Sequence, residues 1–227
     1  MAWLRLYITV EGQTERQFAD TVLKPHLANF AADVRSRVVV TNRKLGKRGG
    51  ILDFRRIETD LTRLLREDRT DATRFTTILD LYALPAEFPG WPEACKKAQP
   101  LARVQTLEAA LQGHIGDWRF TPYIQLHEFE ALLYCDLSAL THRISGVERA
   151  LKNLAQEVAH LAPEAINEGE TTAPSKRLIR HVPIYEKSKV RVGAPAAAAI
   201  GLPVLRQKCP HFGVWLAHLE TLHGETE

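Results

Sequence analysis

The stretch WLRLYITV at residues 3–10, followed by Glu11 and Gly12, decides the fold class of this chain. Its even-numbered positions are apolar, and β-branched and aromatic residues are frequent in it. Alternation of this kind predicts a strand with one face in the core. Glycine lets the backbone turn sharply at the strand end, and Thr14 can cap a helix that follows. We therefore expect the chain to open with a strand, a turn and a helix.

Strands and helices alternate through the first half of the chain. Further strands are predicted at 36–41, 75–82 and 120–126, and further helices at about 54–65 and 93–113. Such alternation is typical of a mainly parallel sheet with right-handed crossover connections. The segment LPAEFPGWP at 84–92 is rich in proline, which predicts a loop.

The second half of the chain has a mostly helical pattern. Helices are expected at 127–134, 146–160, 174–181, 194–200 and 211–222. We therefore predict an α/β fold in which helices flank a mainly parallel sheet, with a helical C-terminal half. Residues 1–135 would form the α/β core, and residues 136–227 a helical extension packed on it as one compact unit.

The composition is that of an ordinary globular protein, with 45% hydrophobic and 25% charged residues. No apolar run is long enough for a transmembrane helix, and the first residues lack the pattern of a signal peptide. We therefore expect a cytoplasmic protein that does not bind membranes. The three cysteines, Cys95, Cys135 and Cys209, are far apart and form no Cys-x-x-Cys pair. Buried free thiols are expected rather than disulfides or a zinc site.

Positive charge is concentrated in two segments, although the net charge is only +3. The first is a glycine-rich loop at 42–50 that carries Arg43, Lys44, Lys47 and Arg48. The second contains Lys176, Arg177, Arg180, Lys187, Lys189 and Arg191. Local excess of this kind suits a polyanion such as nucleic acid, and two solvated surface segments are the alternative. Ser175 can cap a helix there and expose backbone amides to a phosphate.

Acidic residues follow two of the predicted strands. Glu11 comes directly after the first strand, and Asp80 lies near the end of the third. Functional groups of open parallel sheets gather at the carboxyl ends of the strands. Glu15 lies one helical turn beyond Glu11 and can face the same place, or can simply favour the helix dipole. Asp80 can alternatively cap a turn. Converging carboxylates repel unless a hard cation such as Mg²⁺ or Mn²⁺ neutralises them.

Four short segments carry a resemblance to known families. The opening VEGQTE at 10–15 resembles the VEGxTE motif of Toprim domains in the OLD-type nucleases. Together with PYIQLHEFEALL at 122–133, PSKR at 174–177 and CPHF at 209–212, it is similar to domain-of-unknown-function family 4276 over nearly the whole chain. The resemblance implies a Toprim-like, Rossmann-like fold and Mg²⁺-dependent chemistry on phosphodiester bonds. It assigns Glu11 as general acid or base beside the metal and Asp80 as a metal ligand.

The sequence departs from the Toprim pattern at one position. The second acid of the Asp-x-Asp pair is replaced by Tyr82, which cannot serve as a carboxylate ligand. Glu128 and Glu130 are the acids that can substitute, because they follow the end of the fourth predicted strand. Their spacing of two puts them on different faces of a regular helix, and favourable interaction with the helix dipole is the alternative explanation.

These features lead to a primary hypothesis and two alternatives. The first is a metal-dependent nuclease acting on nucleic acid, with DNA favoured over RNA, in phage defence or genome processing. The resemblance also suggests a partner ATPase. The second is a catalytically degraded Toprim-like module that binds nucleic acid or such an ATPase without cleavage. The third is a phosphotransfer enzyme acting on a small substrate. The oligomeric state stays open.

Overall fold

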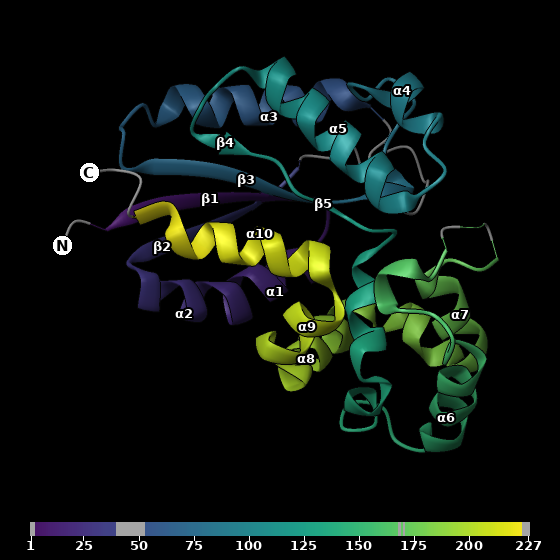
Figure 1. Ribbon diagram of the computed structural model, residues 1–227. Helices are drawn as coiled ribbons and strands as arrows, with labels where there is room; N and C mark the ends of the chain where they lie inside the picture. The colour runs from purple at the N-terminus through teal and green to yellow at the C-terminus, as the bar shows by residue number, and fades with distance from the viewer. Residues whose placement is uncertain (1–2, 40–52, 168, 170, 224–227) are drawn as a thin grey trace.

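The computed structural model describes residues 3–39, 53–167, 169 and 171–223 (Figure 1). Its centre is a parallel sheet with the strand order β2-β1-β3-β4, and a short fifth strand also pairs with β3. The strands are β1 (Leu4–Val10), β2 (Ala32–Val38), β3 (Thr73–Asp80), β4 (Phe120–Thr121) and β5 (Ile124–Gln125). The predicted fold class, an α/β protein with a parallel sheet flanked by helices, is confirmed.

The central strands β1 and β3 are buried along almost their whole length. Such near-continuous burial is expected of parallel strands that are covered on both faces. The two strands lie side by side, with Val10 opposite Ile78 in the register. Their carboxyl ends therefore meet at one edge of the sheet. Glu11 comes directly after β1 at this edge, and Asp80 is the last residue of β3.

Helices cover both faces of the sheet (Figure 1). One face carries α3 (Phe54–Glu67), α4 (Trp91–Cys95) and α5 (Pro100–Ile115). The other face carries α1 (Gln13–Phe18), α2 (Lys24–Leu27) and α10 (Pro210–Thr221), and a π-helical segment, η1 (Ala19–Leu23), joins the first two. Each face has its own hydrophobic core.

The chain after β5 is built from short helices. They are the 3-10 helices η5 (Phe129–Cys135), η6 (Leu137–Leu140), η7 (Pro163–Ala165) and η8 (Pro183–Lys187), and the α-helices α6 (Glu148–Glu157), α7 (Pro174–His181), α8 (Lys189–Ile200) and α9 (Leu202–Lys208). Their apolar side chains belong to the same core as β1 and α1. The final helix α10 returns to the sheet, where Trp215 stacks on Tyr123 and its indole N–H donates to Thr76 Oγ1 at 2.9 Å. None of the helices in the described ranges is long and apolar enough to cross a bilayer.

Several predicted boundaries were wrong, and proline explains two of them. The helix expected at 93–113 is interrupted before Pro100, which begins α5 because proline favours the first helical turn. The strand expected at 120–126 is split at Pro122, whose missing N–H cannot join the ladder. The second strand begins earlier than predicted, at Ala32. The helix expected at 127–134 is a 3-10 helix that begins at Phe129.

Candidate functional site

Adjacent strands bring Glu11 and Asp80 together at the carboxyl edge of the sheet. The backbone N–H of Glu11 donates to the carbonyl of Ile78 at 3.3 Å and so extends the ladder between β1 and β3. The backbone N–H of Asp80 donates to Glu11 Oε2 at 3.3 Å. The two acids that the sequence pattern singled out are therefore neighbours.

Glu15 joins this edge through the turn at Gly12. Gly12 is the N-cap of α1 and has an extended backbone, so the expected cap at Thr14 was wrong. A Cβ atom on Gly12 would lie 2.8 Å from Glu15 Oε2, so the glycine makes room for a carboxylate that folds back over the start of the helix. The Glu15 side chain is buried there. The position favours the helix dipole and also places a third carboxylate beside Glu11.

Glu128 and Glu130 reach the same edge from the segment after β5. The backbone N–H of Phe129, between them, donates to Asp80 Oδ1 at 3.0 Å. His127, just before, has a φ of 64°, a left-handed conformation that is uncommon for a residue with a side chain. Because this irregular turn replaces a regular helix start, both Glu128 and Glu130 lie close enough to Asp80 for their charges to raise its pKa. Both glutamates are buried.

Each of these two glutamates has its own polar partners. Glu128 accepts hydrogen bonds from the backbone N–H and the hydroxyl of Ser175, at 2.8 and 3.0 Å. Glu130 Oε1 lies 2.9 Å from Lys189 Nζ and accepts a longer hydrogen bond, at 3.4 Å, from the hydroxyl of Tyr185. Sequence reasoning missed Lys189 and Tyr185 as site residues. Lys189 was noted only as part of a basic segment, and no spacing links it to an acid about sixty residues earlier.

The carboxylates raise one another's proton affinity. Burial and the charge of Glu15 raise the pKa of Glu11 to about 8. Burial and the charge of Glu130 raise the pKa of Glu15 to about 7. Burial, with Glu11 as the first charged neighbour, raises the pKa of Asp80 well above its ordinary value. Burial and Glu130 also raise the pKa of Glu128. The carboxyl edge therefore holds more negative charge than its surroundings balance.

Among the described residues, Lys189 is a cation that contacts this cluster, through Glu130. Burial lowers the pKa of Lys189, but the ion pair with Glu130 and the charges of Glu128 and Asp80 together raise the pKa above its ordinary value. The charge of Lys189 in turn offsets a small part of the rise in the pKa of Glu15 and Glu128. One ammonium group can neutralise only one of the five carboxylates. Burial and repulsion among the acids therefore still raise the pKa values of Glu11, Glu15, Asp80 and Glu128.

The donor set fits a hard divalent cation in its chemistry. All five side chains offer carboxylate oxygens, which Mg²⁺ and Mn²⁺ prefer over sulfur ligands. In the part of the chain that the structure describes, no three His, Cys, Asp or Glu side chains form a ready-made metal-binding group. Ligation of one ion would therefore need some of these carboxylates to change rotamer.

The basic residues selected from the sequence have different surroundings. Arg43, Lys44, Lys47 and Arg48 lie outside the described residues. Ser175 is the second residue of α7 and not its cap, which is Ala173. Its amide and hydroxyl bind Glu128, so the start of α7 already receives a carboxylate of the same chain. Lys176 is exposed.

Arg177 and Arg180 bind an acid from a neighbouring helix. Arg177 Nη1 contacts Glu157 Oε1, and Arg180 Nη2 donates to both Glu157 oxygens, at 2.6 and 2.7 Å. His181 Nε2 lies 2.9 Å from the same carboxylate. Hydrogen bonding, first with His181, lowers the pKa of Glu157 to about 2. Part of the positive charge on α7 is thus balanced within the protein, and nucleic-acid binding by α7 stays a prediction.

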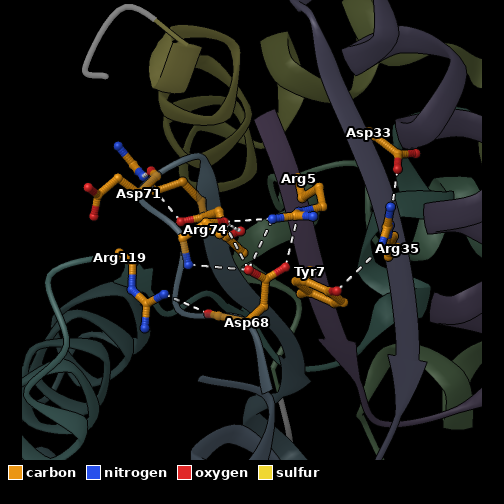
Figure 2. Close-up of polar contacts among 10 residues, drawn as sticks. Arg5, Tyr7, Asp33, Arg35, Asp68, Asp71, Arg74 and Arg119 are labelled. Carbon is orange, nitrogen blue, oxygen red and sulfur yellow. Dashed lines mark hydrogen bonds and ion pairs between the residues drawn. The ribbon is translucent and has the colours of Figure 1, made fainter. Parts of the chain in front are cut away.

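The amino edge of the sheet shows the opposite electrostatic pattern (Figure 2). Asp68, just before β3, pairs with Arg5 at 3.0 Å, and its carbonyl accepts a hydrogen bond from Arg119 at 2.7 Å. Arg119 also pairs with Asp117 at 2.8 Å and lowers the pKa of that carboxyl. Acids at this edge have arginine partners, which is typical of structural ion pairs. The unbalanced carboxylates lie at the carboxyl edge.

An α/β protein with a parallel sheet and a largely buried acidic cluster at its carboxyl edge is the class that this fold and site define. The chain belongs to the family described as "Domain of unknown function (DUF4276)", which matches residues 10–220. Among solved structures, it is similar to the C-terminal region of the Xanthomonas campestris pv. campestris OLD protein. That similarity has 17% sequence identity and a TM-score of 0.40, and covers 96% of this chain and 98% of the other. No curated protein matches the chain.

Proposed function

We propose that this chain is a Toprim-like, metal-dependent nuclease that hydrolyses phosphodiester bonds of nucleic acid at the acidic cluster. The observation that carries the proposal is the gathering of five carboxylates from three separate segments at the carboxyl edge of the sheet. They are Glu11, Glu15, Asp80, Glu128 and Glu130. The resemblance of residues 10–15 to the VEGxTE opening adds to it.

Electrostatics explains why such a site calls for a cation. In the metal-free fold, burial and neighbouring acids destabilise the ionised forms of two carboxyls. These are Glu11, with a pKa of about 8, and Glu15, with a pKa of about 7. A phosphodiester is also an anion, and the cluster would repel it. Mg²⁺ or Mn²⁺ held by Asp80, Glu11 and either Glu128 or Glu130 would polarise a phosphate oxygen and stabilise the leaving oxygen. The positive charge of the ion would neutralise the carboxylates and would also attract the anionic phosphodiester.

The chain's own residues have separable tasks in this proposal. The sequence resemblance assigns Glu11 as the general acid or base, and burial and the charge of Glu15 keep its pKa raised before a cation binds. Glu15 is the second candidate for proton transfer, with a pKa of about 7. Ser175 orients Glu128 through two hydrogen bonds, and Lys189 orients Glu130 through an ion pair. Oriented carboxylates hold their geometry when the charge at the site changes.

Tyr82 is the observation that favours a second candidate function, a degraded module that binds nucleic acid or a partner ATPase without cleavage. Its side chain is 44% exposed and follows the end of β3, in the 3-10 turn Leu81–Ala83. Its backbone N–H donates to the carbonyl of His127 at 3.0 Å, which ties β3 to the segment bearing Glu128 and Glu130. Because those two acids are beside Asp80, we favour the enzyme.

Metal binding is the first test. Mn²⁺ is titrated calorimetrically into the wild type, Glu11→Gln and Asp80→Asn, with Glu148→Gln as the control because Glu148 is an exposed helix residue. We expect saturable binding in the wild type and the control, and loss of binding in the other two. Absence of binding in the wild type would refute the metal site.

Cleavage is tested next, on single- and double-stranded DNA and on RNA, with Mg²⁺ or Mn²⁺. Hydrolysis that depends on Glu11 and Asp80 supports the nuclease, and we expect DNA to be the better substrate. Metal and polymer binding without hydrolysis would instead support the degraded module. Hydrolysis of mononucleotides alone would indicate an enzyme of small substrates. A role in phage defence or genome processing, with a partner ATPase, rests on the sequence resemblance.

A further inference from the structure

Two cysteines far apart in the sequence meet in the core. Cys135 ends η5, and Cys209 lies between α9 and α10, 74 positions further along the chain. Their sulfur atoms are 3.4 Å apart, and both side chains are buried. A disulfide has a sulfur–sulfur distance of about 2.0 Å, so only a small approach separates the contact from a covalent bond. The sequence predicted three buried free thiols; Cys135 and Cys209 are buried, but Cys95 is exposed.

The two thiols differ in their surroundings. The hydrogen bond with Cys209 lowers the pKa of Cys135, against the effect of burial, and the nearby charge of Lys208 lowers it further. Lys208 is held in place because its ammonium donates to the Cys135 carbonyl at 2.6 Å. Contact with Cys135 and burial raise the pKa of Cys209. Because the Lys208 ammonium is held at the Cys135 carbonyl, its positive charge lies near Cys135, and we assign Cys135 to react first as a thiolate, with Cys209 in position to resolve the product.

We propose that Cys135 and Cys209 form a reversible disulfide when the protein meets a small peroxide. The Cys135 thiolate attacks one peroxide oxygen, the O–O bond breaks, and Cys135 becomes a sulfenic acid while the departing hydroxide is protonated to water. The Cys209 sulfur then attacks the sulfenic sulfur. The S–O bond breaks, and the displaced hydroxide leaves as a second water with the Cys209 proton. Two thiols are oxidised and one hydrogen peroxide is reduced.

Burial determines which oxidant can act. Hydrogen peroxide is uncharged and close to water in size, whereas a bulky disulfide such as oxidised glutathione cannot reach two sulfurs in the core. Cys95 is exposed and should react with either reagent. The difference provides an internal comparison within one chain. The inference needs neither a metal ion nor nuclease activity, so it stands or falls independently of the proposed function.

The cross-link would act on the acidic cluster through η5. This short helix begins directly after Glu128, contains Glu130, and ends at Cys135. A covalent bond at its end would fasten η5 to the start of α10, which packs against the sheet through Trp215. Oxidation would thus limit the rotamer and backbone changes available to the segment that bears two of the five carboxylates.

The test uses the full chain with Cys95→Ser, so that two thiols remain. The folded protein is treated with hydrogen peroxide, unfolded in excess alkylating reagent and weighed by intact-mass spectrometry. We expect a product lighter than the reduced protein by two hydrogen atoms, without alkyl groups, that dithiothreitol returns to the reduced form. Peptide mapping should yield one pair linked through Cys135 and Cys209.

Two results would overturn the inference. One is that both thiols stay open to alkylation at peroxide doses that oxidise Cys95 in the unsubstituted chain. The other is that Cys135 gains oxygen atoms without a cross-link. The variants Cys135→Ser and Cys209→Ser in the same background identify the attacking sulfur. We expect a trappable sulfenic acid in the Cys209→Ser variant alone, and the reverse pattern would refute the assignment of Cys135 as the first thiolate.

Discussion

Replacing Glu11 by glutamine tests separately the stability of the fold and the proposed binding of a cation. Glutamine keeps an oxygen that can accept the Asp80 N–H bond, but it carries no charge. A carboxyl whose pKa is higher in the folded than in the unfolded state binds a proton on folding. The stability that Glu11 contributes is therefore complete below its ordinary pKa of 4.5 and is lost as the pH rises through about 8.

The magnitude follows from this shift. Each pH unit between the unfolded and folded pKa removes about 1.4 kcal/mol. Between the ordinary value of 4.5 and neutral pH, this amounts to an upper limit of roughly 3 kcal/mol. Glu11 is only half-buried and shares its proton affinity with Glu15. We therefore expect the metal-free Glu11→Gln variant to be more stable than the wild type by roughly 1–2 kcal/mol at neutral pH.

Urea unfolding measures both effects on the same samples. In EDTA, the advantage of Glu11→Gln should grow from mildly acidic to mildly alkaline pH and vanish near its ordinary pKa of 4.5. With Mn²⁺ at a hundred times its dissociation constant, the wild type should gain about 2.7 kcal/mol and the variant almost nothing. Glu148→Gln, at an exposed position, should match the wild type in its stabilisation by Mn²⁺.

Two outcomes would refute this reasoning in different ways. A metal-free variant that is less stable than the wild type at alkaline pH would mean that the fold does not penalise the Glu11 charge. A variant that keeps the full stabilisation by Mn²⁺ would mean that Glu11 does not hold the ion. The first result concerns electrostatics in the fold and the second concerns the site.

Three further substitutions test the supports of the cluster. Lys189→Met leaves Glu130 without its ion-pair partner. Because the pair is partly exposed, the free energy of unfolding should fall by only about 1–2 kcal/mol at alkaline pH. An equal decrease at acidic pH would refute the ion-pair explanation. Ser175→Ala removes one of two hydrogen bonds to Glu128 and should cost about 1.5 kcal/mol in urea unfolding, with almost no loss expected once Glu128 is replaced by alanine. Gly12→Ala places a methyl group 2.8 Å from a carboxylate oxygen at the end of a flexible side chain; we expect weaker Mn²⁺ binding in calorimetry with an almost unchanged melting temperature, and unaltered binding would exclude that carboxylate from the site.

The sequence predicted that Glu11 and Asp80 lie near each other, because each is at the carboxyl end of a strand in a parallel sheet. What it could not provide is the strand order. Only the adjacency of β1 and β3 makes the two carboxylates neighbours, and hydrophobic alternation identifies strands without pairing them. Membership of domain-of-unknown-function family 4276 was confirmed, whereas the local geometry of the other acids depended on structure that no sequence pattern shows.

Glu128 and Glu130 illustrate that dependence. A regular helix would have put them on different faces, and the left-handed His127 and the 3-10 helix that follows changed their direction. Side-chain pairing is equally hidden from sequence. Arg177 belonged to a basic run, but its partner Glu157 comes from another helix. Composition reveals where charges are numerous, and only the fold reveals which of them are balanced.

The two edges of the sheet show why this distinction matters for function. At the amino edge, Asp117 has Arg119 as a close partner, and that arginine lowers its pKa. At the carboxyl edge, Glu11 and Asp80 have raised pKa values because burial and other acids surround them. The same fold that pairs its acids with arginines at one edge leaves a destabilising excess of carboxylates at the other. An excess that weakens the isolated protein is explained if the balancing charge comes from outside the chain, and the proposed divalent cation would supply that charge where a phosphodiester would also need it.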